Sequence, residues 1–293
     1  MEGGVDLIAL VGVGFKLALY LSSLLAAGFA LVVVVGVVPA RTTRAWLILA
    51  GWLSLSAAVI ALLRVCLSTL QMGDLTMWSM VWEMQNLTIL AVFAGGTAIG
   101  IALIVGLGAG GVLQKGFALL GALLISSSFS VTGHSQALEN PSFFPLIVVG
   151  HVVLVAFWLT APFVLWPHNK LTDGDILART ERFGAIAVIG VPLLFIGGGV
   201  LAWKLGGGLS GLTTSTYGIT LGAKLAASTG ALGLGAVNKL RVATILKNQP
   251  DHGKLELKRT LSADMILFTL ALVAITLATT LFGPPHSMAP RNM

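Results

Sequence analysis

The chain has 293 residues, of which 56% are hydrophobic and only 10% are charged, and its mean hydropathy is +0.96. This composition excludes a soluble globular protein, which needs far more polar surface at this length, and indicates an integral membrane protein. The net charge is +6. Because the basic residues fall in the joins between apolar runs, the positive-inside rule explains them and we expect no nucleic-acid partner.

Eight apolar runs are each long enough to cross a lipid bilayer as a helix of about 20 residues. Segments such as ALVVVVGVV do not alternate between apolar and polar residues, which excludes a transmembrane barrel. We therefore predict one domain, residues 1–293, folded as an all-α bundle of eight transmembrane helices. The predicted helices are 15–38, 46–70, 85–107, 113–132, 145–166, 183–204, 217–238 and 260–282.

Lysine and arginine are distributed unevenly between the two sets of joins. Only Lys204 and Arg291 belong to the set that includes both termini. The positive-inside rule therefore predicts that both termini lie on the outer side and that the other joins are cytoplasmic. Those joins contain Arg41, Arg44, Lys115, Lys170, Arg179, Arg182, Lys239, Arg241, Lys247, Lys254, Lys258 and Arg259.

Two histidines, His134 and His151, flank the join between the fourth and fifth runs, on the predicted outer side. Neutral imidazole is a good ligand for copper and zinc, so the pair predicts a metal site at the outer face. His286, after the Pro284-Pro285 pair, is predicted on the same side and can join that site. The pattern is equally compatible with histidines that pack between helices and bond to backbone carbonyls.

The outer join QMGDLTMWSMVWEMQN contains Met77, Met80 and Met84, whose spacings of three and four place them on one face of a helix. Thioethers are soft ligands that select Cu(I), so this face is a second candidate for metal binding. Glu83 in the same join can bind metal or face water. The alternative is an interfacial amphipathic segment whose methionines and tryptophans contact lipid headgroups.

Lys224 and Asp264 lie inside predicted spans, where an ionisable residue indicates function by default. They are predicted at different depths, so we expect no direct ion pair between them. No Walker, HExxH or nucleophile-elbow motif occurs, and we expect no enzymatic activity. Small residues four apart predict close helix packing at Gly96 and Gly100, and at Gly218, Gly222, Ala226 and Gly230.

The order of these motifs resembles the CopD family of bacterial copper-resistance membrane proteins. The resemblance extends over about residues 120–285 and is weaker over the first four spans. Asp264 stands where the family usually has glutamate, and Thr160-Ala161-Pro162 replaces a glycine pair. The motifs are GHS at 133–135, His151 with Trp158 seven residues later, ERFG at 181–184, and TYGITLGAKLAASTGALGLGAVNKLR at 216–241 with its intramembrane Lys224.

The resemblance implies a multi-pass protein of the bacterial inner membrane that moves copper, as Cu⁺ or Cu²⁺, from periplasm to cytoplasm. It also implies a separate periplasmic carrier of the CopC type as partner, and functional roles for Lys224, Asp264 and Trp158. Two alternatives remain. One is a haem- or quinone-binding redox protein, because histidines in helix bundles also ligate haem iron. The other is a partner that delivers copper to another membrane enzyme without transporting it.

Overall fold

All regular structure is helical in the computed structural model, which describes residues 7–108, 111–131, 143–168, 170–205 and 216–282. The expected all-α fold is thereby confirmed for these residues, with eight long helices. They are α1 (Leu7–Val34), α2 (Ala40–Gln71), α3 (Trp78–Val105), α4 (Val112–Ser127), α5 (Phe144–Leu159), α7 (Asp173–Leu205), α9 (Thr216–Val237) and α11 (Pro250–Leu277). The shorter elements are η1 (Leu75–Met77), α6 (Ala161–Val164), η3 (Asn238–Val242), α10 (Ala243–Asn248) and η4 (Ala278–Phe282).

Six helical segments of the described chain are long and apolar enough to span a membrane. They comprise α1, α2 and α3, α5 with α6, α7, and α11 with η4. Helix α4 is apolar but has only 16 residues. Helix α9 has 22 residues and is not among the six, because Lys224 and many glycine, serine and threonine residues lower its hydropathy. Length and composition thus confirm six of the eight predicted spans.

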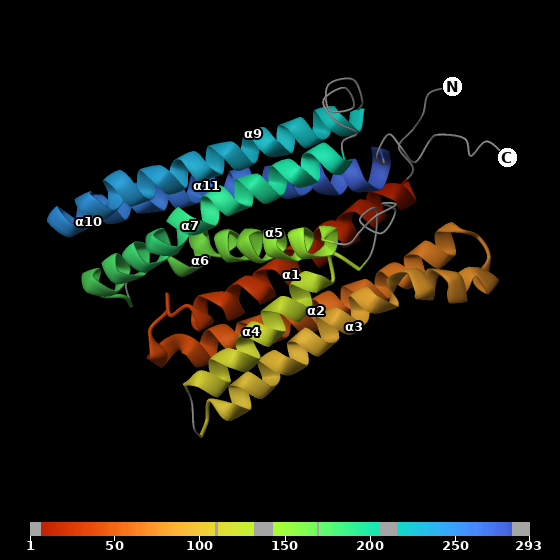
Figure 1. Ribbon diagram of the computed structural model, residues 1–293, viewed down its shortest axis with the longest axis horizontal. Helices are drawn as coiled ribbons and strands as arrows, with labels where there is room; N and C mark the ends of the chain where they lie inside the picture. The colour runs from red at the N-terminus through yellow and green to blue at the C-terminus, as the bar shows by residue number, and fades with distance from the viewer. Residues whose placement is uncertain (1–6, 109–110, 132–142, 169, 206–215, 283–293) are drawn as a thin grey trace.

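The long helices lie side by side along the long axis of the molecule, and the chain reverses direction between them (Figure 1). The start of α1, the end of η4 and the turn between α2 and α3 all lie at one end, which we call the terminal end. The opposite end holds α10 and the starts of α7 and α11, and we call it the basic end. The described part of the chain therefore begins and ends on the same side of the bundle, and the assignment of that side to the periplasm stays a prediction.

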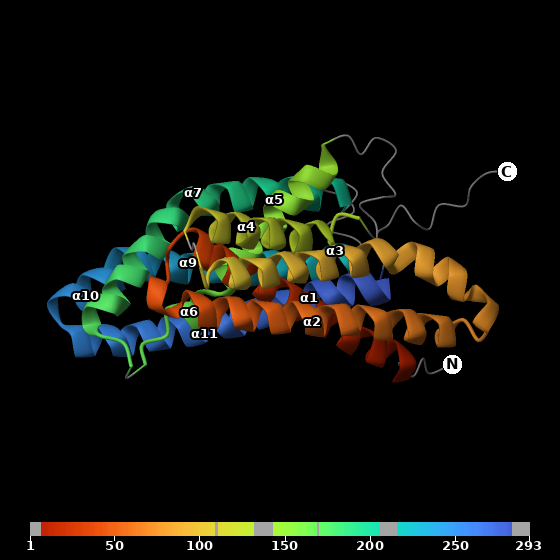
Figure 2. The same cartoon turned by 90° about the horizontal axis from the view of Figure 1, so that it is seen from below.

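Helix α1 occupies the centre of the bundle. It packs against α2, α4, α5 and α11, and Ala26, Ala27 and Ala30 on it are completely buried. Helices α2, α3 and α4 lie on one side of it, and α7, α9 and α11 lie on the other (Figures 1 and 2). Residues 22–33 of this helix are buried on every face, and apart from Ser22 and Ser23 this stretch is apolar all round.

Several of the close helix contacts are made by glycines outside the predicted stripes. A Cβ on Gly28 of α1 would lie 2.2 Å from the carbonyl oxygen of Ala156 on α5, and one on Gly121 of α4 would lie 2.7 Å from the Gly95 carbonyl oxygen on α3. Gly96 does pack closely, against Ser54, but a Cβ on Gly100 or Gly222 would meet nothing within 4 Å. The stripe prediction is therefore wrong at Gly100 and Gly222, because spacing alone does not show which face of a helix meets a partner.

The fifth predicted span is broken near its end. Helix α5 stops at Leu159, and α6 begins at Ala161 after Thr160, whose hydroxyl donates to the Phe157 carbonyl at 2.6 Å. Pro162 in the first turn of α6 has no N–H to continue the α5 hydrogen-bond ladder, so the helix ends before it. The break lies one residue after Leu159 and directly against Gly28 of α1.

Candidate functional site

His151 lies on α5 and faces a run of glycines on α7. A Cβ on Gly197 would lie 3.6 Å from His151 Nδ1, and a Cβ on Gly198 would lie 3.2 Å from His151 Cε1. The ring is therefore seated where α7 has no side chains. A larger residue at Gly198 would occupy the space beside the imidazole.

The Nδ1 atom of His151 is buried and has no hydrogen-bond partner. The backbone of Leu194 on α7 lies near the ring and interacts with it electrostatically. A buried polar atom without a partner is unfavourable and is uncommon in folded proteins. An imidazole nitrogen in this condition can bind a borderline or soft metal ion such as copper.

Lys224 on α9 lies close enough to His151 to act on it electrostatically. The two residues are also at a similar depth, since His151 is the eighth residue of α5 and Lys224 the ninth of α9, and both helices begin at the terminal end. A positive charge here opposes the binding of a second cation at His151. When Lys224 is protonated, its charge therefore disfavours cation binding at this candidate ligand.

Trp158 lies seven residues after His151 on the same face of α5, about 10.5 Å further along the helix axis. Its side chain is 5% exposed and meets the ring of Phe183 on α7 edge to face, with ring centroids 6.4 Å apart. A Cβ on Gly235 of α9 would lie 2.5 Å from Trp158 Cζ2. The indole therefore fills the space between α5, α7 and α9.

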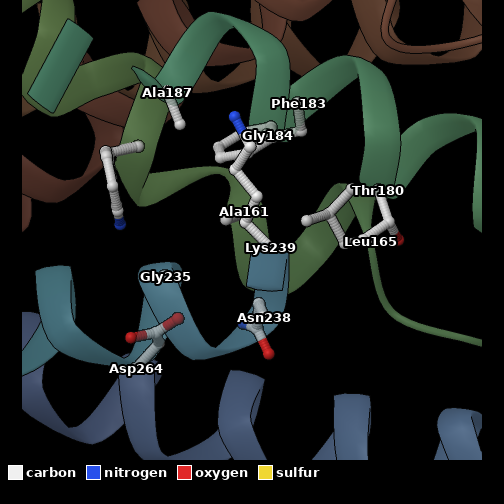
Figure 3. Close-up of a pocket in the computed structure, with 11 residues that line it drawn as sticks. Ala161, Leu165, Thr180, Phe183, Gly184, Ala187, Gly235, Asn238, Lys239 and Asp264 are labelled. Atoms are coloured by element: carbon white, nitrogen blue, oxygen red, sulfur yellow. The ribbon is translucent and has the colours of Figure 1, made fainter. Parts of the chain in front are cut away.

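A small pocket lies beside Trp158, towards the basic end (Figure 3). Its volume is about 30 Å³, enough for about one water molecule. Asp264 of α11 and Asn238 of η3 line it from one side, and Thr180 and Gly184 of α7 line it from the other. Asp264 is 1% exposed, and its Oδ1 has no hydrogen-bond partner. No ion pair joins it to Lys224 in the described part of the chain.

The pocket wall includes a π-helical turn. Asn238 begins η3, and its Oδ1 accepts a hydrogen bond from the hydroxyl of Thr260 on α11. Single π-helical turns inside α-helices occur frequently at functional sites. From the sequence, Asn238 stands out as part of the family motif and as a polar residue with which Lys224 or Asp264 could pair. Thr180 as a pocket residue, and Gly197 and Gly198 as the seat of His151, are not predicted, although three consecutive glycines within an apolar run are a usable signal.

The methionine-bearing turn lies apart from His151. Met77 ends η1, Met80 and Met84 lie on the first turns of α3, and all three are exposed, as is Glu83. Helix α3 packs mainly against α2 and α4, so the described structure does not bring these side chains to α5. The rings of Trp78 and Trp82 stack on this turn, with centroids 6.5 Å apart. Metal binding by the turn stays a prediction.

Two predicted ligands, His134 and His286, lie outside the described residues. Over residues 7–108, 111–131, 143–168, 170–205 and 216–282, no group of three His, Cys, Asp or Glu side chains is arranged to hold a metal ion. Within these ranges no pair of other His, Cys, Asp or Glu side chains completes a metal site around His151, which stays a candidate ligand.

Comparison with protein families gives a match over residues 177–278 to the model described as Copper resistance protein D. The matched residues run from α7 to the end of α11, so they include Lys224, Asn238 and Asp264, while His151 and Trp158 precede them. Neither the curated proteins nor the solved structures give a match.

Proposed function

Because residues 177–278 form a domain of the copper resistance protein D family, we propose that this membrane protein moves copper, as Cu⁺ or Cu²⁺, across the bacterial inner membrane from periplasm to cytoplasm. The observation that carries the proposal is the buried, unpartnered Nδ1 of His151 between α5 and α7. We place the terminal end in the periplasm, as the distribution of Lys and Arg favours.

The exposed turn between α2 and α3 is proposed to collect copper. Helix α2 has 32 residues and is about 48 Å long, well beyond a hydrocarbon core of about 30 Å, so the turn that follows it reaches the aqueous side. Met77, Met80, Met84 and Glu83 are accessible there to a separate CopC-type carrier. His134 and His286 would pass copper from this side to His151.

Lys224 is proposed to keep the binding at His151 weak. A transport site must bind its ion well enough to take it up but weakly enough to release it. The ammonium group of Lys224 lies close enough to His151 to act on it electrostatically, and its charge would repel a copper ion. Copper would therefore stay at His151 only briefly before it moves towards the basic end.

The first test removes the candidate ligand. We expect His151→Ala to reduce copper flux into proteoliposomes by on the order of 10- to 100-fold, as for other changes at metal sites. His168→Ala is the matched control, because His168 is exposed in the connection before α7, and its flux should equal that of the wild type. Equal flux for His151→Ala at equal protein content would refute the proposal. A Soret band from the purified protein would identify the haem-binding alternative instead.

A second test moves the imidazole without removing it. In Gly198→Val the new side chain would press on His151 Cε1, which lies only 3.2 Å from the position of a Cβ. We expect several-fold less copper bound per protein in equilibrium dialysis. Gly199→Val is the control, since a Cβ there meets nothing within 4 Å. Copper binding that is the same in both variants would show that the position of the His151 ring is unimportant.

A further inference from the structure

The pocket beside Trp158 contains a carboxyl group that is not neutralised by a neighbour. Asp264 is almost completely buried, and its Oδ1 faces no donor within the described residues. In Figure 3 its carboxyl group projects from α11 towards the space below Gly184. A lone carboxylate within a membrane is costly and must be neutralised by a proton or by a bound cation.

Among the described residues, no charged group on the surrounding helices forms an ion pair with Asp264. Lys239 of η3 is the other titratable residue among those that line the pocket, and its stem runs along Gly184 without forming an ion pair with Asp264. The lining residues from α5, α6 and α7 carry no charge. Helix α1 brings Lys16 to η4, which continues α11, but that ammonium donates to the Thr279 carbonyl at 3.1 Å, about four turns away from Asp264.

Lys224, on α9, also lies nearer the terminal end than Asp264. Gly230 of α9 lies against Leu267 of α11, and the two helices run in opposite directions. Lys224 is six residues closer than Gly230 to the terminal end, so it lies level with a part of α11 well beyond Asp264. Its ammonium group therefore lies at the depth of His151 in the bundle and not beside the pocket.

The polar groups of the pocket suit a proton better than a metal ion. Hard metal ions in proteins collect about six or more oxygen ligands, and copper prefers sulfur and imidazole. The lining has neither sulfur nor imidazole. The Asn238 Oδ1 already accepts from Thr260, and the Thr180 hydroxyl donates to the Ile176 carbonyl at 2.9 Å. A cavity of about 30 Å³ is large enough for one water molecule, which can deliver or accept a proton.

We propose that Asp264 is a proton-binding site, which takes up one proton that a water molecule in the pocket relays from the aqueous phase, and returns it by the same route when copper passes. The carboxylate and the proton form a neutral carboxylic acid, and no electrons are transferred. His151 lies two helical turns from Trp158, which borders the pocket, so a copper ion on its way to the basic end comes close to Asp264. The coupling to copper rests on the proposed transport function, but the proton site does not.

Infrared difference spectroscopy on the purified full-length protein tests the proton site without copper. At neutral pH the wild type minus Asp264→Asn spectrum should show the carbonyl stretch of a protonated carboxylic acid, shifted in D₂O. Asp251→Asn, which removes a fully exposed carboxyl from the same helix, should leave that band in place. Absence of the band in the wild type would overturn the proposal. Loss of the band on replacing choline chloride by sodium chloride would also overturn it and identify a sodium site.

The coupling is tested in proteoliposomes that contain a pH-sensitive dye. Copper added to the wild type should change the internal pH, and Asp264→Asn should abolish this change while it still binds copper at equilibrium. A normal copper-dependent pH change in Asp264→Asn would refute the coupling. If the wild type moves no copper at all, the transport function fails, while the infrared band still decides whether Asp264 holds a proton.

Discussion

Replacing Gly28 with alanine is expected to lower the free energy of unfolding by about 3 kcal/mol, at the upper end of what overpacking usually costs. The new methyl group would lie 2.2 Å from the Ala156 carbonyl oxygen and 2.4 Å from Thr160 Cγ2. The nearer of these is a backbone atom that no side-chain rotation can move away. Helices α1 and α5 would have to separate at the centre of the bundle, and reversible unfolding in mixed micelles measures the cost.

Gly14→Ala is the control on the same helix. A Cβ on Gly14 meets nothing within 4 Å, and alanine favours a helix over glycine by about 1 kcal/mol. This variant should be as stable as the wild type or slightly more stable. If Gly28→Ala were equally stable, α1 and α5 would not be in close contact at this point.

Replacing Trp158 with alanine is expected to lower the free energy of unfolding by about 3–5 kcal/mol, as for other large aromatic residues in protein interiors. The indole is 5% exposed and is packed against Phe183 and Gly235, so its removal leaves a cavity between three helices. Trp203→Ala is the control, because Trp203 is 58% exposed and should change stability by only about 0.5 kcal/mol.

A double-mutant cycle with Gly235 shows whether the loss comes from this contact. Gly235→Ala alone should be destabilising, since its methyl group would lie 2.5 Å from Trp158 Cζ2. In the Trp158→Ala background the same substitution should cost little, because the obstructing ring is gone. Additive effects of the two substitutions would mean that the two residues are not in contact.

Much of the fold could be predicted from the sequence because hydropathy is a local property that can be summed along the chain. All eight long helices overlap their predicted ranges, but α7 and α11 each begin ten residues before the predicted span, and α1 begins eight before. The start of α1 and the end of η4 lie on the same side of the bundle. The break at Thr160 was not predicted, since a proline inside an apolar run can either kink a helix or end it. The extension of α3 back to Trp78 was also missed, because the residues that precede the apolar run are polar enough to suggest a join.

Four side chains at the candidate sites could be identified from the sequence as unusual. His151, Trp158, Lys224 and Asp264 are rare residue types for their surroundings, and three of them are costly to place in a membrane. Their arrangement depended on the tertiary structure. The structure places His151 against Gly197 and within electrostatic reach of Lys224, and it groups Asp264 with Asn238 and Trp158 two turns below.

By itself, the sequence determined that the chain is a helical membrane protein, which of its residues are unusual there, and which family it resembles. The tertiary structure decided which helix faces meet, and so which unusual residues share a site. The physical reason is that the position of a helix depends on a local run of hydrophobic residues. Helix pairing within a membrane depends instead on close contacts between small residues and complementary side chains that are far apart in the chain. Gly28 against Ala156 and Trp158 against Gly235 are such contacts, and they set the distance between His151 and the pocket of Asp264.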